Sequence, residues 1–168
     1  VVEYPPENNS VYGYALYKQG WCYFNMGDYE KAMDQFKAVV LYAEFAGQEA
    51  VEGKKGSKSS RAGLAKEARN DFVRAYSRAG GTPTDAKDKF AKLTQNPDDL
   101  RLMMKQLANL YYEDGKDREA ALTFDMLIKE RPSAPDAPGY QAKIIDCVMR
   151  AGNKRMTVQQ VRRLVKIT

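Results

Sequence analysis

Two stretches of this sequence decide its fold, Tyr17–Phe36 (YKQGWCYFNMGDYEKAMDQF) and Leu107–Phe124 (LANLYYEDGKDREAALTF). Both contain, in order, a small residue, a tyrosine, a glycine, an alanine and a phenylalanine, separated by three, four, five and four positions: Gly20, Tyr23, Gly27, Ala32 and Phe36, then Ala108, Tyr111, Gly115, Ala120 and Phe124. The small residue and the tyrosine share one face of a first helix, the glycine ends it, and the alanine and the phenylalanine share one face of a second. Each stretch therefore predicts a helical hairpin.

These residues resemble the tetratricopeptide repeat, a helix-turn-helix unit of about 34 residues that closes with a proline, which Pro132 supplies in the second stretch. The resemblance implies an all-α solenoid in which tetratricopeptide-like hairpins stack into a right-handed superhelix. It also implies that the first helices of the repeats line a concave groove, where members of the family bind peptides or protein segments.

Two further segments are weaker copies of the same unit. Residues 64–95 keep Tyr76, a glycine pair at Gly80 and Gly81, Ala86 and Phe90, and Thr82 followed by Pro83 predicts a helix start. Residues 136–168 keep only Gly152 at the turn, with Thr157 and Gln160 as a capping box, and are typical of a degenerate terminal unit. We therefore expect one domain, residues 1–168, with repeats at 11–46, 64–95, 98–132 and 136–168.

The distance between the first two turn glycines, Gly27 and Gly80, is too long for one repeat. An apolar, alanine-rich stretch predicts that the second helix of the first repeat continues past its usual end. The sequence GKKGSKSSRAG, Gly53–Gly63, then breaks the helical periodicity with glycine and serine and carries four basic residues and no acidic one. This pattern predicts a basic insertion loop over residues 47–63.

Aromatic residues lie on two faces of the first predicted helix. Tyr14, Tyr17, Trp21 and Phe24 form a stripe within about 80° of each other, roughly opposite the face that meets the second helix. Three interpretations remain open for this stripe: it packs against the neighbouring repeat, it meets an upstream repeat or partner, or it lines the groove as a binding platform, with Tyr17 and Trp21 as the main contacts.

By the resemblance, the groove continues through polar side chains of the second and third repeats. Its lining would include Asn70 and Arg74, then Lys105, Asn109 and Tyr112. Lys105 and Asn109 stand one turn apart, as do the residues with which some family members clamp the terminal carboxylate of a peptide. The rest of that clamp is missing, since Tyr17 and Trp21 occupy the corresponding places in the first repeat, and a solvated helix face explains Lys105 and Asn109 equally well.

Composition argues against catalysis. The 168 residues include no histidine, which removes the usual general base and the commonest metal ligand, and the two cysteines lie far apart without metal-type spacing. We expect no enzyme activity, no catalytic residue, no cofactor and no metal. The net charge of +5 is small, and the basic clusters do not interleave with aromatic residues, which makes nucleic acid an improbable partner. No run of about 20 apolar residues predicts a transmembrane segment.

The function these patterns favour is a protein-protein interaction scaffold that binds a partner protein or peptide. The first repeat also resembles those of bacterial cell-envelope proteins of the TolA-binding and outer-membrane-assembly lipoprotein kind, in which A-x-Y-K-x-G precedes G-D-Y-x-x-A. That resemblance implies a subunit of an envelope complex in the periplasm, with a cytoplasmic scaffold as the alternative. A self-associating module that forms a homodimer or a filament is the competing function.

Overall fold

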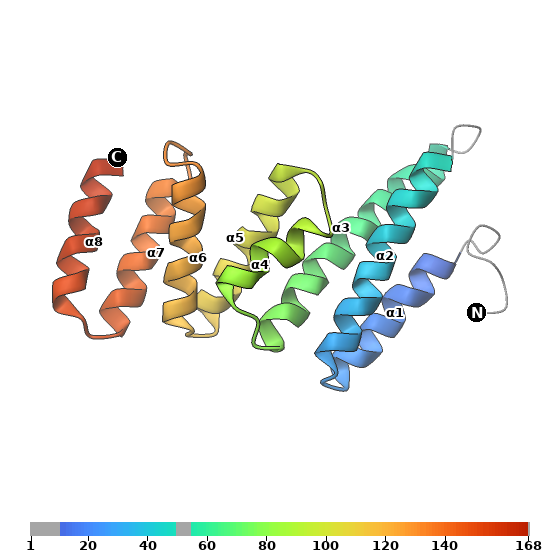
Figure 1. Ribbon diagram of the computed structural model, residues 1–168, viewed down its shortest axis with the longest axis horizontal. Helices are drawn as coiled ribbons and strands as arrows, with labels where there is room; N and C mark the ends of the chain where they lie inside the picture. The colour runs from blue at the N-terminus through green and yellow to red at the C-terminus, as the bar shows by residue number, and fades with distance from the viewer. Residues whose placement is uncertain (1–10, 50–54, 168) are drawn as a thin grey trace. The chain divides into compact units, whose positions relative to one another are not determined.

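The computed structural model describes residues 11–49 and 55–167, and within these ranges it contains eight α-helices and no strand (Figure 1). The predicted all-α fold is confirmed. Contacts within the chain divide it into two compact units, one ending at Gly80 and one beginning at Gly81. The expectation that all 168 residues form one domain stays a prediction.

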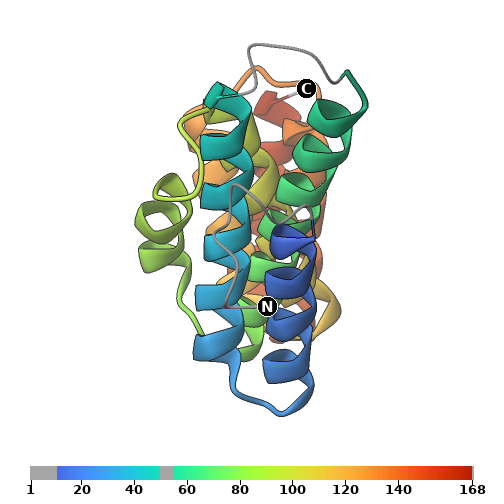
Figure 2. The same ribbon diagram turned by 90° about the vertical axis from the view of Figure 1, so that its right-hand side faces the viewer.

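Unit 1 is built from three long helices that lie side by side in Figure 2: α1 (Tyr12–Asn25), α2 (Tyr29–Glu49) and α3 (Lys55–Arg78). Apolar residues recur on α2 every three or four positions, which places them on one continuous face. That face and its counterpart on α3 form the core, made by Ala32, Met33, Phe36, Val39, Val40, Ala65, Ala68, Phe72, Val73 and Tyr76. The predicted extension of the second helix of the first repeat is confirmed, because α2 runs to Glu49.

The hairpin of α1 and α2 depends on two glycines with different tasks. A β-carbon at Gly20 would lie 2.6 Å from Cε1 of Phe36, so only glycine lets that ring sit against α1. Gly27 has a φ of +79°, the left-handed conformation that ends a helix at little cost without a side chain. The other predicted turns also contain a glycine with positive φ, at Gly80, Gly115 and Gly152.

The predicted basic loop over residues 47–63 is wrong for most of its length. Helix α2 continues to Glu49, and α3 begins at Lys55 and includes the three serines and two of the three glycines that predicted a loop. Only residues 50–54 of the predicted loop lie outside the described residues. Glycine and serine are poor helix formers, but the following turns of α3 bury Ala65, Ala68 and Phe72, and packing of this kind overrides weak local preference.

Unit 2 begins with the short α4 (Pro83–Ala91) and continues with α5 (Pro97–Glu113), α6 (Asp117–Glu130), α7 (Ala137–Arg150) and α8 (Lys154–Ile167). Neighbours in the sequence from α5 to α8 pack against each other, and Figure 1 shows them in chain order. The core of this unit includes Phe90, Leu93, Met103, Leu107, Tyr111, Phe124, Leu127, Tyr140 and Ile144. Tyr111 also ties α5 to the start of the unit, because its hydroxyl donates a hydrogen bond of 2.5 Å to the carbonyl of Gly81.

The helix starts confirm one predicted cap and correct another. The side chain of Thr82 accepts a hydrogen bond from the backbone N–H of Asp85, with Pro83 in the first turn, as predicted. Helix α8, in contrast, is capped by Asn153, whose side-chain oxygen accepts from the N–H of Met156. The capping box predicted from Thr157 and Gln160 is wrong, since Thr157 already lies inside the first turn.

The predicted repeats correspond unequally to the two units. The first repeat is the α1–α2 hairpin, the third is α5–α6 and the fourth is α7–α8. The helices of the predicted second repeat, α3 and α4, belong to different units. Helix α3 completes the core of unit 1 instead, where it packs along α2 and also contacts α1.

Candidate functional site

The aromatic stripe predicted on α1 is only partly open to solvent. Tyr14 is 55% exposed and carries the ammonium group of Lys18 over its ring at 5.0 Å. Tyr17, Trp21 and Phe24 are each half-buried. The stripe therefore divides into one exposed residue and three that pack against the rest of unit 1.

Tyr17 joins the three helices of unit 1. Its ring centroid lies 5.9 Å from that of Phe36 on α2, and its hydroxyl donates a hydrogen bond of 2.6 Å to Oδ2 of Asp71 on α3. Partial burial and this hydrogen bond to a carboxylate raise the pKa of Tyr17 above its usual range, so the hydroxyl keeps its proton. This geometry fits the interpretation in which the stripe packs against the segment around Asn70 and Arg74.

Trp21 and Phe24 form an aromatic cluster with the second helix. The ring centroids of Trp21 lie 5.1 Å from Phe24 and 6.1 Å from Phe36, both in edge-to-face geometry, and Phe24 meets Tyr29 at 5.3 Å. Such pairs stabilise the fold by about 0.5–1.5 kcal/mol each beyond the area they bury. Trp21 is half-buried, so part of its side chain remains accessible to a partner.

Asn70 and Arg74, predicted in the groove, lie exposed on α3 on either side of the buried Asp71. Arg74 pairs with Oδ1 of Asp71 at 3.3 Å, while Tyr17 binds the other carboxylate oxygen. Asp71 is 5% exposed, so these two partners offset the cost of burying its charge. The structure thus brings Tyr17 and Arg74 together around one carboxylate.

The three residues predicted on the third repeat lie together on α5, and each meets a residue at the start of α7 or along it. Asn109 accepts a hydrogen bond of 2.6 Å from Nζ of Lys143. The hydroxyl of Tyr112 donates to Asp146 at 3.1 Å, and Lys105 pairs with Asp136 at 3.5 Å. We call this set the α5–α7 surface: Lys105, Asn109, Tyr112, Asp136, Lys143, Asp146 and Arg150.

Tyr112 is the centre of the α5–α7 surface. The guanidinium of Arg150 lies 4.4 Å and the ammonium group of Lys143 5.1 Å from its ring centroid, within the range of cation–π attraction. The hydrogen bond to Asp146 raises the pKa of the Tyr112 hydroxyl. One half-buried ring therefore holds two cations and one carboxylate around it at the surface.

A buried arginine fixes the start of this surface. Arg101 donates hydrogen bonds of 3.0 Å to the carbonyl of Leu127 and of 3.1 Å to Oδ1 of Asp136, and the Tyr140 hydroxyl donates to the other oxygen of Asp136. Burial acts to raise the pKa of Asp136, but the hydrogen bond from Tyr140 and the charges of Arg101 and Lys105 outweigh it and lower that pKa. Asp136 thus stays ionised at neutral pH, and together with Arg101 it joins α5, α6 and the start of α7.

Sequence reasoning missed the part of the surface that α7 supplies. Lys143, Asp146 and Arg150 are spaced by three and four positions and so share one face of a helix, which was the available signal. Their contacts with Tyr112 depend on how the α7–α8 hairpin stacks on the α5–α6 hairpin. The spacing of residues within one helix does not determine that stacking.

The predicted site residues belong to separate units. Tyr14, Tyr17, Trp21, Phe24, Asn70 and Arg74 lie in unit 1, and Lys105, Asn109 and Tyr112 lie in unit 2. A single groove that runs through all of them stays a prediction, as does the binding role of each residue. Within the separate units, the predicted residues form two local surfaces, the aromatic stripe of α1 and the α5–α7 surface.

The described part of the chain, residues 11–49 and 55–167, lacks two other kinds of functional feature. In this part of the chain, no group of three or more histidine, cysteine, aspartate or glutamate residues is placed to hold a metal ion. Across the same residues, none of the helices has both the length and the apolar character needed to cross a membrane. Of the two cysteines, Cys147 is buried, where burial raises the pKa of its thiol, and Cys22 is exposed.

Comparison with known protein families supports the hairpin assignment. A tetratricopeptide repeat family model matches residues 14–43 and residues 106–134, which correspond to the α1–α2 and α5–α6 hairpins. No curated protein matches the chain. Tetratricopeptide repeats generally mediate protein–protein interaction, and the family is typically a non-enzymatic scaffold. The chain therefore contains two tetratricopeptide repeats within a fold of helical hairpins.

Proposed function

We propose that this protein is an interaction scaffold that binds a segment of a partner protein along the α5–α7 surface. The observation that carries the proposal is Tyr112, a half-buried ring with Lys143 and Arg150 over it and Asp146 bonded to its hydroxyl. Tyrosine and arginine are enriched among residues that dominate binding energy at protein interfaces. The surface lies on the first helices of two neighbouring hairpins, the position at which repeats of this family line a groove.

The polar groups of this surface can exchange partners without disturbing the core. Lys143 is held by a hydrogen bond to Asn109 and by cation–π contact with Tyr112, and Arg150 is held by Tyr112 and by an ion pair of 2.7 Å with Asp117. A carboxylate or a backbone carbonyl of a bound segment can therefore take over Lys143 or Arg150 while Arg101 and Asp136 keep the helices in place. This arrangement favours recognition of a peptide with hydrogen-bonding groups and at least one acidic residue.

The aromatic stripe of α1 is the second part of the proposed contact. Tyr14 is exposed and Trp21 is half-buried, and large amphipathic rings give contact area at low entropic cost. We expect Trp21→Ala to weaken partner binding more than loss of a lysine from the segment 54–58, which lies at the edge of the described residues.

Selection of peptides from a displayed random library against the wild-type chain tests the proposal. Peptides selected for binding should lose affinity for Tyr112→Ala and for Lys143→Ala by about tenfold, or ~1.4 kcal/mol. Arg118→Ala is the matched control, since Arg118 is an exposed cation on α6 outside both surfaces, and it should bind as the wild type does. Equal binding by all three variants would remove the α5–α7 surface from the proposal.

A role as a subunit of a bacterial envelope complex, in the periplasm, extends this proposal. Its support is the resemblance of the first repeat, A-x-Y-K-x-G followed by G-D-Y-x-x-A, to repeats of envelope lipoproteins. Fractionation of the source cells with an antibody against this chain tests it, because the chain should follow an envelope or periplasmic marker. Recovery with a cytoplasmic marker would favour the cytoplasmic scaffold instead.

Self-association into a homodimer or a filament is the competing function, and the exposed ring of Tyr14 is the observation that favours it. Light scattering over a concentration series should separate the two functions when it is applied to the wild type, Tyr14→Ala and Trp21→Ala. A molar mass that rises with concentration and falls to the monomer value in folded variants would assign the stripe to self-assembly. A constant monomer mass in all three would leave the stripe to a foreign partner or to packing within unit 1.

A further inference from the structure

The last described helix of unit 2, α8, carries two adjacent stripes of opposite character that the α5–α7 surface does not use. At 3.6 residues per turn, Val158, Val161 and Val165 fall within about 60° of one another. Arg155, Arg162 and Lys166 fall within about 40° and lie beside the valines. The helix contains no acidic residue. Its other side packs on α7, where Gln160 accepts a hydrogen bond of 2.9 Å from Gln141.

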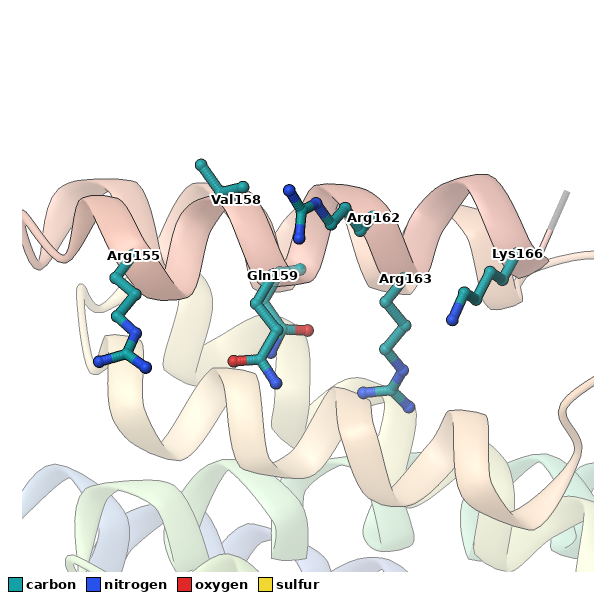
Figure 3. A pocket seen from close by; sticks show the side chains of 7 residues that line it. Arg155, Val158, Gln159, Arg162, Arg163 and Lys166 are labelled. Carbon is teal, nitrogen blue, oxygen red and sulfur yellow. The ribbon is translucent and has the colours of Figure 1, made fainter.

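The valine stripe is open to solvent. Val158 is 52%, Val161 44% and Val165 73% exposed, although valine is a residue that folding normally buries. One exposed valine needs no explanation, but three on one face of a helix form a continuous apolar strip. Figure 3 shows Val158 projecting from α8 on a different side from Arg155, Arg163 and Lys166.

The basic stripe borders an open hollow of about 840 Å³ along α8, lined by Arg155, Val158, Gln159, Gln160, Arg162, Arg163 and Lys166 (Figure 3). Arg163 already forms an ion pair of 2.5 Å with Asp125 on α6. Arg155, Arg162 and Lys166 have no ion pair with any described carboxylate, whereas Arg101, Arg131 and Arg150 of the same unit each have at least one. The hollow therefore combines three uncompensated cations with a valine edge.

We propose that α8 is a docking surface for an acidic amphipathic helix of another protein. Apolar side chains of that helix would cover Val158, Val161 and Val165, and carboxylates at the edge of its apolar face would pair with Arg155, Arg162 and Lys166. This surface is distinct from the proposed groove, because α8 contributes no residue to the α5–α7 surface. Charge complementarity sets the partner's chemistry and speeds its association, while burial of the valines provides affinity.

The same features disfavour three other occupants. A nucleic acid backbone would use the cations and leave the valine stripe exposed. A membrane surface is better matched by helices that present Trp, Phe or Leu, and the exposed stripe here consists of valines. A second copy of the described chain offers no wholly acidic helix, because each of the eight helices contains at least one lysine or arginine.

Fluorescence anisotropy with designed peptides tests the proposal on the full chain. The probe is a labelled helical peptide with leucines on one face and glutamates along its border. A second peptide replaces the leucines with serine, and a third replaces the glutamates with lysine. We expect the first peptide to bind the wild type at least tenfold more tightly than either of the others, with an affinity that falls as salt is added.

Two matched protein variants locate the contact. The α8 variant is Arg155→Glu/Arg162→Glu/Lys166→Glu, and the control is Lys66→Glu/Lys92→Glu/Arg118→Glu, which makes the same charge change at exposed positions outside α8. The first peptide should lose at least tenfold in affinity for the α8 variant and keep its affinity for the control, and the lysine peptide should prefer the α8 variant. If circular dichroism shows that the α8 variant is unfolded, Arg155→Gln/Arg162→Gln/Lys166→Gln replaces it. This second variant should also weaken binding of the first peptide.

Several results would overturn the proposal. The first is that the first peptide does not bind at all. The second is that the first peptide loses the same affinity for the α8 variant and for the control variant. The third is that the leucine and serine peptides bind equally well, which would indicate charge attraction alone. Tighter binding of duplex DNA or of vesicles containing anionic lipid through the same three residues would assign α8 to those partners. A dimer in light scattering that only the α8 variant abolishes would assign it to a second copy. Tyr112→Ala should leave binding of the first peptide unchanged, so failure of the proposed groove and failure of the α8 surface are distinguishable.

Discussion

The contact between Gly20 and Phe36 shows how a single residue sets the distance between two helices. A β-carbon at position 20 would come within 2.6 Å of the ring, and Phe36 is fully buried, so the ring has nowhere to move. We expect Gly20→Ala to lower the free energy of unfolding of unit 1 by about 1–2 kcal/mol, because overpacking outweighs the gain of about 0.5–1 kcal/mol in helix propensity. Urea denaturation followed by Trp21 fluorescence measures it, and a stabilised variant would show that the hairpin is looser than described.

Sequence reasoning found Gly20 because its distances to Tyr23, Gly27 and Phe36 recur at Ala108, Tyr111, Gly115 and Phe124. It also found Lys105, Asn109 and Tyr112 from their places on the third repeat. It could not find their pairing with Lys143, Asp146 and Arg150, because a contact over more than thirty residues depends on how hairpins stack. Local spacing carries information on one hairpin, and side-chain networks between hairpins require the fold itself.

At the scale of the element, α3 is where expectation and structure differ most. Its first turns are rich in glycine and serine and predicted a loop, yet they are helical and continue into turns that bury Ala65, Ala68 and Phe72. Gly63 lies inside this helix with nothing within 4 Å of a β-carbon placed there. We expect Gly63→Ala to raise the free energy of unfolding by about 0.5–1 kcal/mol and to increase the helical signal in far-UV circular dichroism. A decrease in both would indicate that this segment needs a backbone conformation that only glycine adopts.

The attachment of α8 to α6 depends on the ionisation of Asp125. Burial acts to raise the pKa of Asp125, but hydrogen bonds from Lys129 and Arg163 outweigh it, so that pKa lies below its usual range. A carboxyl whose pKa is lower in the folded than in the unfolded state stabilises the fold above its ordinary pKa of about 3.9. That stabilisation is lost as pH falls through the lowered value.

The melting temperature of the wild type and of Asp125→Asn over a series of pH values checks this expectation. The difference between the two proteins should be largest near neutral pH and should shrink as the pH falls below about 4, because the carboxyl is then protonated first in the unfolded state and, at the lowered pKa, in the folded state. Arg163→Gln is the companion variant, because it removes the partner from α8 and should reduce the same difference. A gap that stays constant down to the lowest pH would show that Asp125 contributes packing without charge.

For the whole molecule, the division at Gly80 and Gly81 predicts that the two units respond separately to a core mutation. Leu107 is fully buried in unit 2, and Leu107→Ala should cost about 2–5 kcal/mol there. Trp21 is the only tryptophan and lies in unit 1, so its fluorescence reports on unit 1, while far-UV circular dichroism reports on the helices of both units.

In urea, Leu107→Ala should shift part of the circular dichroism transition to a lower urea concentration. The midpoint of its fluorescence transition should stay at the wild-type value. Val39→Ala, a buried change in unit 1, should move the fluorescence midpoint instead. Coincident transitions in both variants would show that the units unfold as one cooperative domain, which is what the sequence predicts, because coupling between repeats would then exceed the loss in either core.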